Sequence, residues 1–116
     1  MVLIWSTQSP IGDVAARETL DAALAFAAYD QAVTLLLSDA GVMQLQSMPN
    51  AKQAGAKNMS KLMKALPMYD IDNVYACQTS LSRFSIDTQQ CVTPVQTATT
   101  DDIHALILGA THVIRV

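Results

Sequence analysis

The chain has 116 residues, a net charge of −3 and 15% charged residues, which fits one small domain and excludes a broad basic surface for nucleic acid. No apolar run approaches the roughly 20 residues that a membrane-spanning helix needs. Charged residues usually make up about a quarter of a domain. We therefore expect other subunits to cover part of this surface.

The two cysteines and the first residues give the expected compartment. Cys77 and Cys91 lie too far apart for a CxxC redox pair or a zinc knuckle. Two such thiols suggest a reducing compartment. The first residues lack the basic flank and long apolar stretch of a signal peptide. These features predict a soluble cytoplasmic protein.

The first half of the chain alternates between apolar runs and helical periodicity. The run VLIW is typical of a buried strand, and the alanine-rich stretch after Asp13 has high helix propensity. We predict a strand over 2–5, a helix from Asp13 to about 29, a strand over 32–37 and a short helix over 42–46.

The second half continues the alternation. Asn58 is expected to cap a helix that Pro67 stops, and Thr79 or Ser80 is expected to cap the helix that follows the strand ending at Cys77. We predict helices over 58–66, from about 79 through Phe84 and Ile86, and over 100–109. Strands are predicted over 74–77, over 91–95 as an edge strand containing Pro94, and over 112–116.

Strands and helices alternating along a chain are typical of a parallel sheet. We therefore predict an α/β fold, with one three-layer domain over 1–116, a mostly parallel sheet of about five strands and helices on both faces. The pattern does not fix the strand order.

Cys77 is the leading candidate for chemistry because it falls where a strand ends and a helix begins. That position lies at the usual ligand edge of an open α/β sheet, where helix N–H groups favour a thiolate. Two interpretations remain open: a structural cysteine that packs as a small hydrophobe, or a nucleophile that accepts a sulfane sulfur and passes it on. A persulfide relay needs only one thiol at a time. Cys91 lies in an apolar segment and is expected to fill the core.

The loop over 6–12 follows the first predicted strand, where many α/β folds cradle phosphate. It lacks both GxGxxG and GxxxxGK[ST], so a surface turn is the favoured interpretation. Arg17 is expected to pair with Asp13 or Asp21.

A few basic side chains form the remaining candidates. Lys57, Lys61 and Lys64 share one predicted helix face, preceded by Lys52, and are expected to form a solvated face. An acidic partner or an RNA backbone is the alternative. His104 and His112 have no neighbouring ligands at metal-binding spacing, so we expect no metal and no cofactor.

Several segments together carry a family resemblance. They are Ser6-Thr7, RETLDA over 17–22, LLSDAGVMQL over 36–45, MYDID over 68–72 continuing to Cys77 and Ser80-Leu81, and HVIRV over 112–116. In this order they resemble the DsrE/DsrF-like superfamily, in particular its TusC/DsrF branch. One departure is Phe84-Ser85, where relatives tend to carry Arg-Gly.

The resemblance implies a subunit of a sulfur-relay (sulfurtransferase) complex. Its partners would be TusB/DsrH-like and TusD/DsrE-like subunits in a dimer of heterotrimers, together with upstream and downstream sulfur carriers. Persulfide sulfur would pass toward 2-thiolation of the tRNA wobble uridine, with tRNA contact at most indirect, or would come from dissimilatory sulfur oxidation.

In that family the working cysteine lies chiefly on the D-type subunit, and the C-type subunit is mainly structural. Cys77 occupies the equivalent strand end, so the resemblance implies an auxiliary persulfide carrier and not the main catalytic subunit. A homo-oligomer is possible for the isolated chain. The alternative of a different class is a flavodoxin-like module that binds a small ligand or nucleotide through the 6–12 loop.

Overall fold

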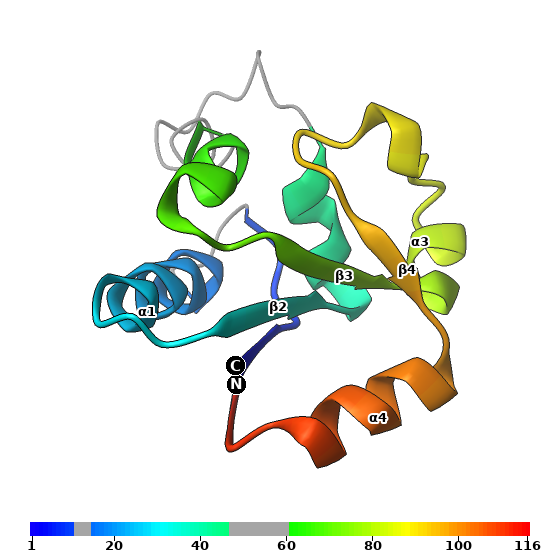
Figure 1. The fold of residues 1–116 in the computed structure, drawn as a ribbon. Helices are drawn as coiled ribbons and strands as arrows, with labels where there is room; N and C mark the ends of the chain where they lie inside the picture. The colour runs from blue at the N-terminus through cyan, green and yellow to red at the C-terminus, as the bar shows by residue number, and fades with distance from the viewer. Residues whose placement is uncertain (11–14, 47–60) are drawn as a thin grey trace.

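Five parallel strands form one sheet in the order β4-β3-β2-β1-β5. The computed structural model describes residues 1–10, 15–46 and 61–116 (Figure 1). The strands are β1 (Val2–Ser6), β2 (Val33–Leu37), β3 (Asn73–Cys77), β4 (Gln96–Ala98) and β5 (His112–Arg115). The predicted parallel α/β sheet is therefore confirmed, and the structure adds the order of its strands.

The chain crosses the sheet in one direction from β1 to β4. Crossovers between parallel strands are right-handed, so steady movement in one direction places all of these connections on the same face. They are α1 (Ala15–Ala28), the 3-10 helix η1 (Asp39–Leu45), a helix over 61–65 continued by η2 (Leu66–Tyr69), α3 (Gln78–Arg83) and η3 (Thr88–Gln90).

This face holds the main hydrophobic core. Side chains of alternate strand residues point into it and meet the helices above. The central contributors are fully buried aliphatic residues: Val2, Ile4, Leu20, Leu35, Leu37, Leu45, Met63, Leu66 and Ile71.

The last helix, α4 (Thr100–Gly109), crosses back from β4 to β5. Because the chain reverses its direction along the sheet, the same handedness places α4 on the opposite face. Figure 1 shows α4 apart from the other helices, leading to the chain end beside the first strand. Helices on both faces are thus confirmed, but none of the residues of α4 is buried, and Leu108 is 86% exposed.

A capping box fixes the start of α4. The Thr99 side chain accepts a hydrogen bond from the Asp102 N–H, and the Asp102 carboxylate accepts one from the Thr99 N–H at 2.9 Å. The two bonds satisfy helix donors that would otherwise lack a partner. The helix starts at Thr100 as predicted, with Thr99 as its cap.

Two predictions about the region after β3 are wrong. Cys77 itself is the N-cap of α3, in place of the predicted Thr79 or Ser80. The Ser80 hydroxyl instead accepts a hydrogen bond from the Asp39 N–H at 2.8 Å, so it joins α3 to η1. The edge strand predicted over 91–95 lies further on, at Gln96–Ala98, because the Val92 N–H donates to the Leu45 carbonyl and not to a neighbouring strand.

The helix after Cys77 is also shorter than predicted, because α3 ends at Arg83. The Ser85 N–H donates to the Ser82 carbonyl and the Ile86 N–H donates to the Leu81 carbonyl. This pair of bonds is a Schellman motif, which needs a left-handed residue after the helix. Ser85 fills that position with φ of 54°.

The remaining helix boundaries differ from prediction in smaller ways. The helix predicted over 42–46 is a 3-10 helix that begins earlier, at Asp39. The helix predicted to stop at Pro67 continues through it as η2, where Pro67 lies in the first turn and needs no helical N–H partner. The predicted caps Asp13 and Asn58 lie outside the described residues.

Candidate functional site

Cys77 is the last residue of β3 and the cap residue of α3. Its thiol is free, and the residue is half-buried. Val74 and Ala76 are buried in the main core, so Tyr75 and Cys77, which alternate with them, lie on the opposite face, the one that α4 crosses. The thiol therefore belongs to the thinly covered side of the sheet.

Cys77 lies at a point in the sheet where two neighbouring strands are followed by helices on opposite faces. Cys77 pairs with Ala98 at the carboxyl ends of the neighbouring strands β3 and β4. From these ends α3 leaves on the core face and α4 leaves on the other face. In open α/β sheets, ligands bind in the crevice that such a divergence creates. Cys77 thus lies at the carboxyl edge of the sheet, where the sequence predicts that a strand ends and a helix begins.

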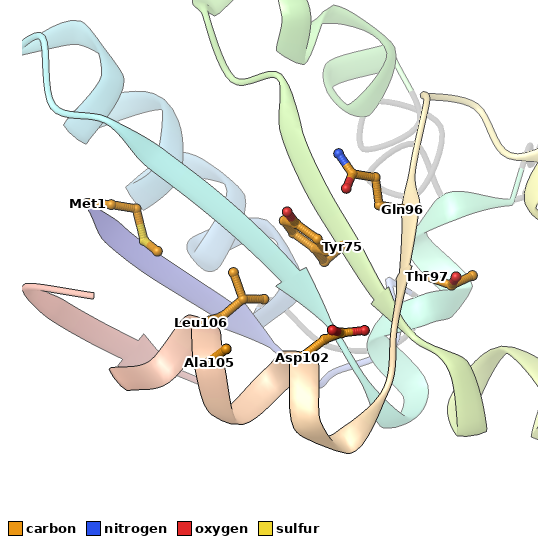
Figure 2. A pocket seen from close by; sticks show the side chains of 7 residues that line it. All are labelled: Met1, Tyr75, Gln96, Thr97, Asp102, Ala105 and Leu106. Carbon is orange, nitrogen blue, oxygen red and sulfur yellow. The ribbon is translucent and has the colours of Figure 1, made fainter. Parts of the chain in front are cut away.

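A pocket of about 380 Å³ lies on the same face, between α4 and the strands β3 and β4. Figure 2 shows the side chains of Tyr75 and Gln96 above it and those of Ala105 and Leu106 on the helix below it. Tyr75 precedes Cys77 by two residues, so their Cα atoms are about 7 Å apart along the strand. The lining residues are Met1, Tyr75, Gln96, Thr97, Asp102, Ala105 and Leu106.

The sequence pattern does not predict this pocket. Tyr75 and Cys77 share a strand face by simple alternation, but Asp102 and Leu106 reach them only through the crossover of α4. The one available signal was the acidic first turn of α4, which marks a helix start but not the strand that it faces.

The end of β1 is filled by a buried polar network. The hydroxyls of Ser6 and Thr19 lie 2.9 Å apart, and the side-chain amide of Gln44 donates to the Ser6 hydroxyl at 2.8 Å and to the Gln8 carbonyl at 3.0 Å. These groups bond to one another and so offer no donors to a phosphate. Residues 11 and 12 of the predicted loop lie outside the described residues.

Cys91 lies partly buried beside the main core, the location predicted for a core-filling residue. It packs against the main core, and its Sγ donates to the Asp87 carbonyl at 3.5 Å. Burial raises the pKa of the Cys91 thiol, and the nearby negative charge of Asp87 raises it further. A raised thiol pKa lowers the fraction of thiolate, which is the nucleophilic form of cysteine.

The other charged candidates lie at the surface. Arg17 pairs with Asp21 at 3.1 Å, one of its two predicted partners. Lys61 and Lys64 are exposed, as expected for a solvated face, whereas Lys52 and Lys57 lie outside the described residues. His104 and His112 are exposed as well. Within residues 1–10, 15–46 and 61–116, no group of three or more potential metal ligands occurs.

Comparison with known proteins gives a consistent result. The model of the DsrE/DsrF-like family matches residues 1–116. The Protein TusC homolog of Pseudomonas aeruginosa is 39% identical over 80 residues, which cover 69% of this chain and 67% of that protein. The Protein TusC homolog of Vibrio vulnificus is 27% identical over 99 residues, covering 85% and 84% of the two chains.

A solved structure shows the same fold. The crystal structure of the ychN protein from E. coli superposes with a TM-score of 0.83 and covers 99% of this chain and 97% of its own. The two sequences are 19% identical, so the likeness concerns the arrangement of strands and helices.

Proposed function

The chain belongs to the DsrE/DsrF-like family, and from this membership we propose that it is a mainly structural subunit of a complex that passes persulfide sulfur toward tRNA wobble-uridine 2-thiolation. The similarity to two TusC homologues favours the tRNA branch over dissimilatory sulfur oxidation. The chain acts as one domain, and its companions are TusB/DsrH-like and TusD/DsrE-like subunits.

The observation that carries the structural role is the surface around α4 and β5. No residue of α4 is buried, although half of that helix is aliphatic or alanine. Leu108, Val113 and Val116 are 86%, 42% and 39% exposed. A helix that is apolar on several sides is ordinarily covered, and exposed apolar patches mark interaction sites. Companion subunits that cover this surface account for the low share of charged residues.

Cys77 is proposed as an auxiliary persulfide carrier. Its thiolate attacks the outer sulfur of a donor persulfide, the S–S bond of the donor breaks, and the donor leaves as a thiolate. An acceptor thiolate then attacks the outer sulfur of the Cys77 persulfide. The S–S bond breaks, the acceptor keeps that sulfur, and Cys77 leaves as a thiolate. Each step transfers one sulfur atom from a persulfide to a thiolate and releases another thiolate, so no oxidant is needed. The position of Cys77 at the ligand edge, free of a disulfide, supports this role.

Mass spectrometry after incubation with a persulfide donor tests the carrier role. We expect one added sulfur on the wild-type chain and on Cys91→Ser, and none on Cys77→Ser. Sulfur bound to Cys77→Ser as strongly as to the wild type would exclude Cys77 as the carrier.

Co-expression with B- and D-type subunits tests the structural role. We expect all three chains to elute together, with Leu108→Glu weakening the assembly because it places a charge on the surface that is to be buried. Elution of the wild-type chain as a monomer in the presence of both companions would contradict the proposal. Tyr29→Glu, at an exposed position just after the end of α1, is the matched control.

The compartment is proposed as the cytoplasm. Within the described residues, the longest helix falls short of what a bilayer crossing requires. The two free thiols fit a reducing environment.

A further inference from the structure

The pocket beneath α4 combines one carboxylate with an aromatic ring, neutral polar side chains and apolar side chains. Among its seven lining residues, Asp102 carries the only charged side chain. The Tyr75 ring and the Gln96 amide lie across from Asp102 on the strands, and the side chain of Met1 lies at the left of the view (Figure 2). Such a lining suits a group that is cationic, flat and attached to an apolar stem.

Asp102 retains an acceptor for such a group. Its Oδ2 accepts the Thr99 N–H in the capping box, and the two oxygens of a carboxylate have further lone pairs for a second donor. The same bond, from the Thr99 backbone, lowers the pKa of Asp102, so the carboxylate stays charged near neutral pH. Asp101 adds a second negative charge beside it, outside the pocket lining.

We propose that this pocket receives an arginine side chain of a protein partner. A guanidinium is planar, so it stacks on an aromatic face such as that of Tyr75, and its five N–H donors suit the acceptors of Asp102 and Gln96. The methylene stem packs along Ala105 and Leu106, which line the helix side of the pocket. The inference rests on the proposed function only in taking the partner to be a protein of the relay.

The volume and the charge favour this occupant over two others. About 380 Å³ is near the lower end for small-molecule sites. A phosphate-bearing ligand would meet the Asp102 carboxylate, and apart from the Met1 amino terminus the lining residues carry no cationic group to offset it. A lysine ammonium would satisfy Asp102 but, as a compact point charge, would use the flat Tyr75 face less well.

NMR titration of the full chain with N-acetyl-arginine amide tests the proposal. We expect saturable shifts of the Leu106 methyl groups and the Gln96 side-chain amide, with no comparable shifts from the neutral citrulline analogue. Asp102→Asn, which keeps the side-chain size, is expected to weaken binding about 1.5- to fivefold, the range of an exposed charge pair. The matched control Asp101→Asn removes the same charge outside the lining and is expected to bind like the wild type.

A second variant covers the case in which Asp102→Asn disturbs the helix start. Ala105→Met keeps every charge and fills the pocket, and it is expected to abolish the shifts. Equal weakening by Asp101→Asn and Asp102→Asn, or shifts caused by uridine and not by arginine, would overturn the proposal. Cys77→Ser is expected to bind the probe normally while losing sulfur, so failure of the pocket and failure of the carrier role can be told apart.

Discussion

The guanidinium of Arg115 lies over the indole ring of Trp5, 4.5 Å from its centroid. The same indole donates its N–H to the Ser38 hydroxyl at 2.7 Å. Trp5 on β1 therefore connects the last strand on one side with the end of β2 on the other.

Replacing Arg115 with Gln is expected to lower the free energy of unfolding by about 0.5–1 kcal/mol, because the stacked cation is lost at a partly exposed site. Trp5 is the single tryptophan of the chain, so its emission reports the change directly. Urea unfolding followed by fluorescence measures both effects. Arg83→Gln, which removes a cation 5.3 Å from the Phe84 ring, is the control and should leave the emission wavelength unchanged.

Gly41 lies against the end of β1 and tolerates no side chain. A Cβ atom there would meet the Ser6 carbonyl oxygen, whereas a Cβ at Gly109 would meet nothing within 4 Å. Gly41→Ala is expected to cost about 1–3 kcal/mol through overpacking. Gly109→Ala is expected to be neutral or stabilising, since Ala favours a helix end over Gly. Thermal unfolding of both variants measures the difference, and equal stability would refute the close approach.

Ser85 holds a backbone conformation that glycine adopts at lower cost. Its φ of 54° places it in the left-handed region, at the residue after α3. Ser85→Gly is expected to stabilise the chain by about 0.5–1 kcal/mol, because the left-handed penalty of a Cβ is removed. Ser82→Gly, inside α3, should have the opposite effect. Denaturant midpoints of the two variants show the signs.

The start of α4 is expected to weaken in acid. The pKa of Asp102 lies below its ordinary value of 3.8, mainly because its carboxylate accepts the Thr99 backbone N–H. A lowered folded-state pKa means that this stabilisation is present above the ordinary pKa and is lost as the pH falls through the folded value. The Thr99 amide signal in NMR should therefore shift below about pH 4.

Two variants check the assignment of that titration. Asp102→Asn should abolish the acid shift of the Thr99 amide, and Asp101→Asn should retain it. An unchanged titration in Asp102→Asn would show that another group controls the helix start.

The sequence was sufficient to predict the kinds of elements and the class of fold. Alternating apolar runs and helices indicated the parallel sheet, and the residues around Cys77 indicated the junction between a strand and a helix. Periodicity succeeded here because strand and helix spacing are local properties of the chain.

What the sequence could not show depends on contacts between distant segments. Among the described helices, the reversal between β4 and β5 places only α4 on one face and so creates the pocket, and no local pattern encodes that reversal. The Ser80 hydroxyl binds Asp39, 41 residues away, and so did not serve as the expected cap. The bond from Val92 to Leu45 likewise displaced the predicted edge strand.

The pairing of β1 with β5 also sets the order in which the sheet can be completed. Thr111 donates to the Met1 carbonyl across 110 residues of sequence, and Val116 donates to the Trp5 carbonyl. During synthesis, the edge of β1 that pairs with β5 has no neighbouring strand until almost the whole described chain has left the ribosome. Pairings this distant slow folding and leave a strand edge open to other chains in the meantime.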